Sequence, residues 1–143
     1  MKIEEYLKQF GIKEQIDTIS LNRALYRKAD KTLLQKKPAY SGELIARQRG
    51  DTYIPSINFL QHIGKQARHK VHVDNKGEWM VICGRDLFKK SVTKHTNPQP
   101  DDKVVIINQH DECIGYGDYQ EGRIAVKNLF DIGNLLRRER KRR

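Results

Sequence analysis

The chain has 143 residues, of which 37% are hydrophobic and 32% are charged, and its formal net charge at pH 7 is +10. This length suits one ordinary domain or two small ones, and the sequence contains no run of about eighteen apolar residues that could cross a membrane. The first residues mix acidic side chains into an amphipathic pattern and lack the apolar region of a signal peptide, so we expect a cytoplasmic protein.

The positive charge is unevenly distributed along the chain. Residues 1–67 carry 12 basic and 7 acidic residues, and residues 68–143 carry 16 and 11, so each part has a net charge of +5. In the second part the whole excess lies in residues 137–143, which are six basic residues and Glu139. Such concentrated positive charge favours nucleic acid as a partner, with a tail that only confers solubility as the alternative.

Two helical segments are predicted near the start of the chain. Hydrophobic residues at helical spacing predict a helix over residues 2–10 that ends at Gly11. A second helical stretch is predicted from Ser20 to about Lys28, with Ser20 or Asn22 as its N-cap.

The rest of the first half is predicted to contain both strands and a helix. Two short strands, at residues 44–46 and 51–55, are expected on either side of a turn that contains Gly50. Ser56 is then expected to cap another helix. A domain boundary is predicted near residues 66–68, where the pattern changes from α/β to mostly β.

The second half is predicted to be rich in strands. Alternating residues predict a strand at 70–73, and residues 103–108 form the least ambiguous strand, with residues 113–116 as its expected partner. The apolar block at residues 78–83 fits either a strand or a buried helix. Trp79 in this block is expected in the core, with stacking on a base as the alternative.

The last part of the chain combines a strand with a basic helix. Residues 123–127 predict a strand, and Arg123 and Lys127 would then point to the same face because they are four residues apart. Asp131 can cap a following helix that carries Leu135 and Leu136 and continues into the basic end. A strand, a turn and a basic helix together predict a surface that binds a polyanion.

No pattern typical of catalysis or metal binding is present in the sequence. His69 and His72 would point to opposite faces of a strand, and no phosphate-loop motif occurs. Cys83 and Cys113 lie 30 residues apart without a second cysteine pair, so we expect buried, reduced thiols and not a zinc site. We therefore expect no enzyme, no cofactor and no metal.

Several of these segments carry a resemblance to a known family. The segments KVHV, EWMVICGRD, VVII, IGYG and IAVK with its following helix occur in the order of a PUA domain, at residues 70–73, 78–86, 104–107, 114–117 and 124–127. Residues 53–60, 67–73 and 131–138 also resemble the pre-PUA–PUA proteins of the Nip family (member seven). This resemblance covers residues 40–140 best.

The resemblance implies an α+β fold with a small α/β pre-PUA domain at residues 1–66. Residues 67–143 would form a six-stranded PUA pseudo-barrel with a basic C-terminal tail, in which residues 78–83 are helical. It further implies an RNA-binding protein that acts in biogenesis of the large ribosomal subunit and in pre-rRNA processing, through single-stranded, uridine-rich RNA. Protein partners on the pre-ribosome or the RNA exosome are implied for the first domain.

Two other functions remain open at this point. The first is an accessory subunit of a tRNA-modifying enzyme that presents tRNA to a separate catalytic chain. The second is a protein-interaction adaptor on the ribosome.

The resemblance also implies where RNA lies: against the first PUA helix, the glycine-containing loop after it, and the last strand with its helix. The matching basic residues next to Gly84 are Arg85, Lys89 and Lys90. Those on the last strand and helix are Arg123, Lys127, Arg137 and Arg138. The alternative for the two last arginines is that they only stabilise the end of a helix.

Overall fold

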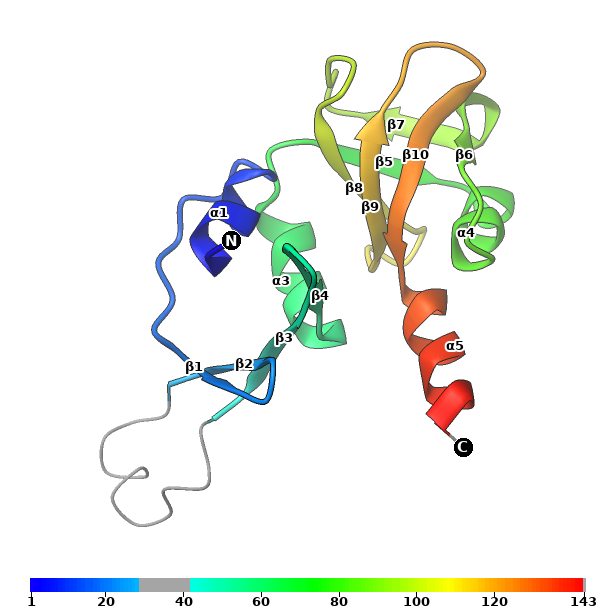
Figure 1. The fold of residues 1–143 in the computed structure, drawn as a ribbon. Helices are drawn as coiled ribbons and strands as arrows, with labels where there is room; N and C mark the ends of the chain where they lie inside the picture. Colours follow the sequence, from blue (N-terminus) through cyan, green and yellow to red (C-terminus); the bar gives the residue numbers. More distant parts are fainter. Residues whose placement is uncertain (29–41, 143) are drawn as a thin grey trace.

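The computed structural model describes residues 1–28 and 42–142, with side chains as far as Arg137. These residues form an amino-terminal α/β unit and a β-barrel, and helix α3 leads from one to the other (Figure 1). Within the described residues, no helix has the length and apolarity needed to cross a membrane.

The amino-terminal unit contains helix α1, a small sheet and helix α3. α1 spans Ile3–Lys8, and α3 spans Ile57–Gln66. The Ser56 side chain accepts a hydrogen bond of 3.1 Å from the backbone N–H of Phe59, which confirms the predicted cap. The sheet has the antiparallel order β1-β2-β3-β4, with strands at Thr18–Leu21, Ala24–Arg27, Leu44–Arg49 and Thr52–Pro55.

Strands β1 and β2 form a hairpin where the sequence pattern predicts a helix, so that prediction is wrong. Asn22 and Arg23 lie at its turn with φ angles of 49° and 66°. Two successive left-handed residues cannot continue a right-handed helix, whereas their twist matches that of a two-residue hairpin turn. Leu21 consequently pairs with Ala24, and the hairpin continues into the sheet.

The second half of the chain forms a six-stranded barrel, as the resemblance implies. The strand order is β6-β10-β9-β8-β5-β7, and only the β5–β8 pair is parallel. A short 3₁₀ helix, η1, spans Lys89–Ser91. The strands are β5 Lys70–Val73, β6 Leu87–Phe88, β7 Val92–His95, β8 Lys103–Ile107, β9 Cys113–Tyr119 and β10 Ile124–Asp131. The α+β class and the PUA-like pseudo-barrel are therefore confirmed.

Helix α4, at Asn75–Ile82, resolves the ambiguity of the apolar block in favour of a helix. Its buried side is formed by Gly77 and Val81, and a Cβ atom on Gly77 would lie 3.0 Å from side chains of the barrel. Trp79 lies two residues from each of them, which places it on the opposite side of the helix. Its side chain is 69% exposed, so the prediction of a core tryptophan is wrong.

The two cysteines lie in different environments. Cys113 is buried, as expected, and burial raises the pKa of its thiol to about 12. Cys83 is exposed at the end of α4, which corrects the expectation of two buried thiols. A Cβ atom on Gly64 would lie 2.6 Å from the Cβ of Cys113, so α3 packs unusually closely against β9.

One hydrophobic cluster joins the amino-terminal unit to the outer face of the barrel. Tyr6 and Phe10 of the first unit pack in it with Tyr116 and Phe130 of the barrel. The Tyr6 hydroxyl donates a hydrogen bond of 3.0 Å to the Tyr116 hydroxyl, and burial raises the pKa of both phenols. A second cluster fills the barrel itself and includes Val71. The two units are thus held together by shared aromatic packing.

Candidate functional site

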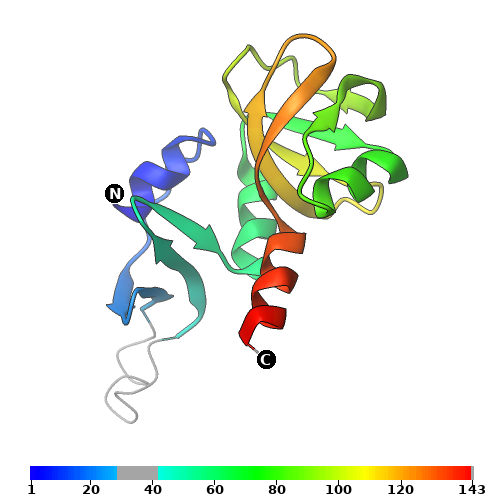
Figure 2. The ribbon, with the colours of Figure 1, turned by 45° about the vertical axis from the view of Figure 1, so that its right-hand side comes forward.

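Strand β10 and helix α5 organise the candidate site, since every predicted site residue lies on them or beside them. β10 is longer than predicted and runs directly into α5, at Ile132–Arg142 (Figure 2). The Asp131 side chain accepts a hydrogen bond of 2.9 Å from the backbone N–H of Asn134, which confirms the predicted cap. A Cβ atom on Gly117 would lie 2.0 Å from the Lys127 carbonyl oxygen, so β9 needs glycine there to pair with β10.

The first group of basic residues surrounds an aromatic ring. Phe88, Lys89, Lys90 and Arg123, which we call the Phe88 cluster, line a shallow cavity of about 350 Å³. The Lys90 Nζ atom lies 5.9 Å from the ring centroid, and the Arg123 Cζ atom lies 5.5 Å from it. Among the described residues, none of these three cations has a carboxylate partner. The cluster therefore offers free positive charge beside an aromatic face.

The position of Arg123 differs from the one expected for it. β10 begins at Ile124, so Arg123 lies in the preceding turn and not on the strand. The four-residue strand spacing from Lys127 therefore does not determine its direction. Instead, the Arg123 carbonyl oxygen accepts a hydrogen bond of 2.9 Å from the backbone N–H of Lys89, which holds the two residues together.

Lys127 lies in the middle of β10 and is exposed. It pairs in register with Asp118 of β9, and Asp118 pairs in turn with Lys103 of β8. The Lys103 Nζ atom lies 2.7 Å from the Asp118 carboxylate, so that carboxylate is already neutralised. The cross-strand row Lys103–Asp118–Lys127 therefore has a net charge of +1, and Lys127 supplies it.

Arg137 connects α5 to α4. Its Nη1 atom donates a hydrogen bond of 3.0 Å to the Ile82 carbonyl oxygen, and its Nη2 atom lies 3.3 Å from the Asp131 carboxylate. The Asp131 side chain is only 4% exposed, whereas that of Arg137 is 47% exposed. Arg137 also lies against Gly84, where a Cβ atom would be 3.3 Å from Nη2. Arg137 thus holds the two helices together while part of its guanidinium faces solvent.

The two remaining predicted residues are Arg85 and Arg138. Arg85 is exposed in the loop after α4, and its carbonyl oxygen accepts a hydrogen bond of 3.1 Å from the Asn128 side chain on β10. Arg138 lies on α5, but its side chain is outside the described part of the structure. The predicted residues thus fall into four places: the loop after α4, the Phe88 cluster before β10, the middle of β10 and the middle of α5.

Phe88 is a candidate site residue that the sequence alone did not single out. Its position next to two lysines was the available signal, but the contribution of Arg123 depends on the pairing of β6 with β10. An aromatic face among cations can stack a base while the cations contact phosphates. Within the described residues, no group of His, Cys, Asp and Glu side chains could hold a metal ion.

The chain is similar in sequence to two curated proteins, each 28% identical to it over the matched residues. A UPF0113 protein of Archaeoglobus fulgidus is 28% identical over 113 residues, which cover 72% of this chain and 64% of the relative. The 60S ribosome subunit biogenesis protein nip7 of Schizosaccharomyces pombe is 28% identical over 94 residues, which cover 58% of this chain and 52% of the relative. The chain thus spans between half and two thirds of the length of these curated relatives.

Solved structures show the same fold. A conserved PUA domain protein from Thermoplasma acidophilum superposes with a TM-score of 0.62 at 20% identity, covering 96% of this chain and 91% of the other. A PUA domain protein from Aeropyrum pernix K1 gives a TM-score of 0.58 at 15% identity, covering 94% and 83%. The model of the UPF0113 PUA domain family matches residues 69–140. Since this match spans half of the chain and includes the barrel, β10 and most of α5, the protein belongs to the UPF0113 PUA domain family.

Proposed function

We propose that this protein is a non-catalytic RNA-binding factor in the assembly of the large ribosomal subunit. The family assignment and the relative named as a 60S ribosome subunit biogenesis protein support this role. The bound RNA would be single-stranded and uridine-rich, and its context would be processing of precursor rRNA.

The observation that carries the proposal is the Phe88 cluster, in which three cations without a carboxylate partner among the described residues lie near a partly buried ring, two of them within cation–π distance of it. Single-stranded RNA exposes both its phosphates and the faces of its bases, and this cluster has a group for each. The proposed RNA-binding residues further include Lys127 on β10, Arg85 after α4 and Arg137 on α5, together with Arg138 at the next position of α5. RNA would bind these residues without covalent chemistry.

In the same proposal, residues 1–66 form a domain that recruits protein partners, and residues 67–143 form the RNA-binding domain. The partners would be proteins of the pre-ribosome or of the RNA exosome. Because both units share one hydrophobic cluster, RNA and partner would be held at a fixed relative orientation.

The salt dependence of RNA binding tests this proposal. Fluorescence anisotropy with a labelled oligouridylate, repeated over a range of KCl concentrations, gives the slope of log affinity against log salt. Each phosphate contact on a single strand contributes about −0.7 to that slope, so Arg123→Gln with Lys89→Gln and Lys90→Gln should flatten it by about 2. An unchanged slope would remove the Phe88 cluster from the site.

The matched control removes the same charge elsewhere. Lys13, Lys28 and Lys65 are exposed residues of the amino-terminal unit, and replacing all three with Gln should leave the slope nearly unchanged. Competition with folded tRNA tests the accessory-subunit alternative, which requires tRNA to bind more tightly than the single strand. Removal of residues 138–143 tests the adaptor alternative, which requires RNA binding to be independent of the basic end.

A further inference from the structure

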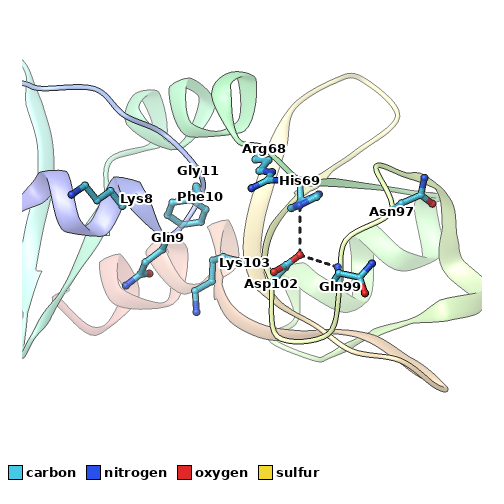
Figure 3. Close-up of a pocket in the computed structure, with 10 residues that line it drawn as sticks. All are labelled: Lys8, Gln9, Phe10, Gly11, Arg68, His69, Asn97, Gln99, Asp102 and Lys103. Atoms are coloured by element: carbon cyan, nitrogen blue, oxygen red, sulfur yellow. Dashed lines mark hydrogen bonds and ion pairs between the residues drawn. The ribbon is translucent and has the colours of Figure 1, made fainter.

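A second cavity lies between the amino-terminal unit and the barrel, apart from the Phe88 cluster. It has a volume of about 510 Å³, which lies within the usual range for small-ligand sites. Its lining comes from residues 8–11 at the end of α1, residues 68–69 before β5, and the residues between β7 and the start of β8 (Figure 3). We call it the junction cavity.

The junction cavity has an excess of available positive charge. Lys8 and Arg68 line it, are exposed, and have no side-chain partner among the described residues. Asp102 is its single acidic lining residue, and this carboxylate is already engaged. It lies 3.5 Å from the His69 Nε2 atom and accepts a hydrogen bond of 2.8 Å from the backbone N–H of Gln99. These contacts leave the Asp102 carboxylate its negative charge, so Lys8, Arg68 and Asp102 together give an excess of one positive charge, which favours an anion.

The same cavity also presents neutral hydrogen-bonding groups. Gln9 comes from the amino-terminal unit, whereas Asn97 and Gln99 come from the barrel (Figure 3). Each of these amides can both donate and accept, which is what recognition of the polar edge of a nucleobase requires. A site with two cations and three amides matches a phosphate joined to a base better than it matches a simple anion.

The position of Arg68 is fixed by the fold. Its backbone N–H donates a hydrogen bond of 2.8 Å to the Phe10 carbonyl oxygen. Gly11 has a φ of +77°, and a Cβ atom there would lie 2.7 Å from the Arg68 Cβ atom. The turn after α1 therefore packs directly against the segment before β5. A site whose walls are held in place in the free protein loses less entropy when a ligand binds.

The junction cavity is connected to the surface of β10. Lys103 lines the cavity and belongs to the cross-strand row that continues through Asp118 to Lys127. Adjacent strands are about 4.8 Å apart, so Lys127 lies about 10 Å from Lys103 along this row. A strand of RNA that passes over Lys127 can therefore reach the cavity.

We propose that the junction cavity binds one nucleoside monophosphate unit, with the phosphate at Arg68 and the base at the amides, and with Lys8, whose side chain points away from Arg68 (Figure 3), as a further cation at the rim. If the RNA-binding function proposed above holds, on which this part rests, the unit is one nucleotide of the bound strand. Otherwise the ligand is a free nucleotide. In both cases the ligand is a phosphate joined to a base. Two arms of one experiment distinguish a nucleotide of bound RNA from a free nucleotide.

The first arm measures oligouridylate binding to Lys8→Gln with Arg68→Gln. Loss of up to two phosphate contacts should flatten the salt slope by about 0.7 to 1.4 and weaken binding at least roughly threefold. The control, Lys13→Gln with Lys65→Gln, removes the same charge from exposed positions that do not line the cavity. If the oligonucleotide binds and both double variants behave like the wild type, the cavity is not part of the RNA site, while the Phe88 cluster remains.

The second arm titrates uridine 5′-monophosphate, up to about 10 mM, into the full-length ¹⁵N-labelled protein. Saturable shifts of the Gln9, Gly11 and His69 amide signals, abolished in the Lys8→Gln, Arg68→Gln variant, support the site. If RNA fails to bind but these shifts occur, the proposed RNA function is refuted and the ligand is a free nucleotide. If neither probe affects these residues, the junction cavity is not a nucleotide site.

Discussion

The contact between Arg137 and Asp131 gives a quantitative prediction about the end of β10. Arg137→Gln leaves the nearly buried Asp131 carboxylate without its cation, and Asp131→Asn keeps the helix cap but removes the negative charge. A double-mutant cycle with these two substitutions isolates the coupling between the charges, because both amides preserve most of the side-chain volume.

The magnitude follows from the geometry. Exposed ion pairs contribute about 0.2 to 1 kcal/mol, and hydrogen bonds to charged groups contribute about 1.5 to 3 kcal/mol. The Arg137 side chain is 47% exposed and that of Asp131 is 4% exposed, so this pair belongs between those cases. We expect Arg137→Gln to lower the free energy of unfolding by about 2 kcal/mol, with a coupling energy of about 1 to 1.5 kcal/mol.

Urea unfolding, followed by far-UV circular dichroism, measures all four proteins of the cycle. The slope of the free energy against urea should stay constant, which shows that the same surface is exposed in each case. Arg85→Gln, a neighbouring exposed arginine, should change stability by less than about 0.5 kcal/mol. A coupling energy below about 0.3 kcal/mol would refute the structural role that the geometry gives to Arg137.

Three further predictions concern the packing of the barrel. Tyr116→Phe removes the acceptor of the buried Tyr6 hydroxyl, and urea unfolding should show a loss of about 1 to 3 kcal/mol. Gly117→Ala would place a methyl group 2.0 Å from the Lys127 carbonyl oxygen, so we expect a loss above about 2 kcal/mol in the same assay. The raised pKa of Cys113, about 12 against an ordinary 9.0, means that the unfolded chain loses this proton first as pH rises. Its contribution to stability should therefore be complete below pH 9 and fall by about 1.4 kcal/mol per pH unit above it, and Cys113→Ala should remove this part of the pH dependence.

Each of these predictions has a control or an opposing result. Substitution of the exposed Cys83 by Ala should leave the alkaline loss of stability unchanged, and an equal effect of both cysteine variants would contradict the assignment to the buried thiol. Full stability of the Gly117→Ala protein would mean that β9 and β10 do not approach as described. A neutral Tyr116→Phe substitution would show that the Tyr6 hydroxyl finds another partner.

Local sequence patterns predicted one continuously apolar strand and two helix caps. The strand at Lys103–Ile107, the Ser56 cap and the Asp131 cap depend on neighbouring residues only, and the structure confirms all three. The hairpin at Asn22 and Arg23 was missed because the left-handed conformation of an arginine is not encoded by its hydrophobicity.

The side on which α4 is buried was also beyond local patterns. Hydrophobicity suggested Trp79 for the core, but the barrel accepts Gly77 there because its walls leave no room for a larger side chain. The candidate site was likewise predictable only in part, because its grouping also depends on long-range packing. The basic residues themselves were identified from the sequence and the resemblance. The grouping of Lys89 and Arg123 around Phe88 required the long-range pairing of β6 and β10.

The shared aromatic cluster has a consequence for how the protein folds during synthesis. Tyr6 and Phe10 leave the ribosome early, yet their packing partners Tyr116 and Phe130 are among the later residues to emerge. Until then the nascent chain exposes apolar rings that would otherwise be covered, and such surfaces favour aggregation or capture by chaperones. The first unit should therefore complete its folding only after most of the barrel has been translated.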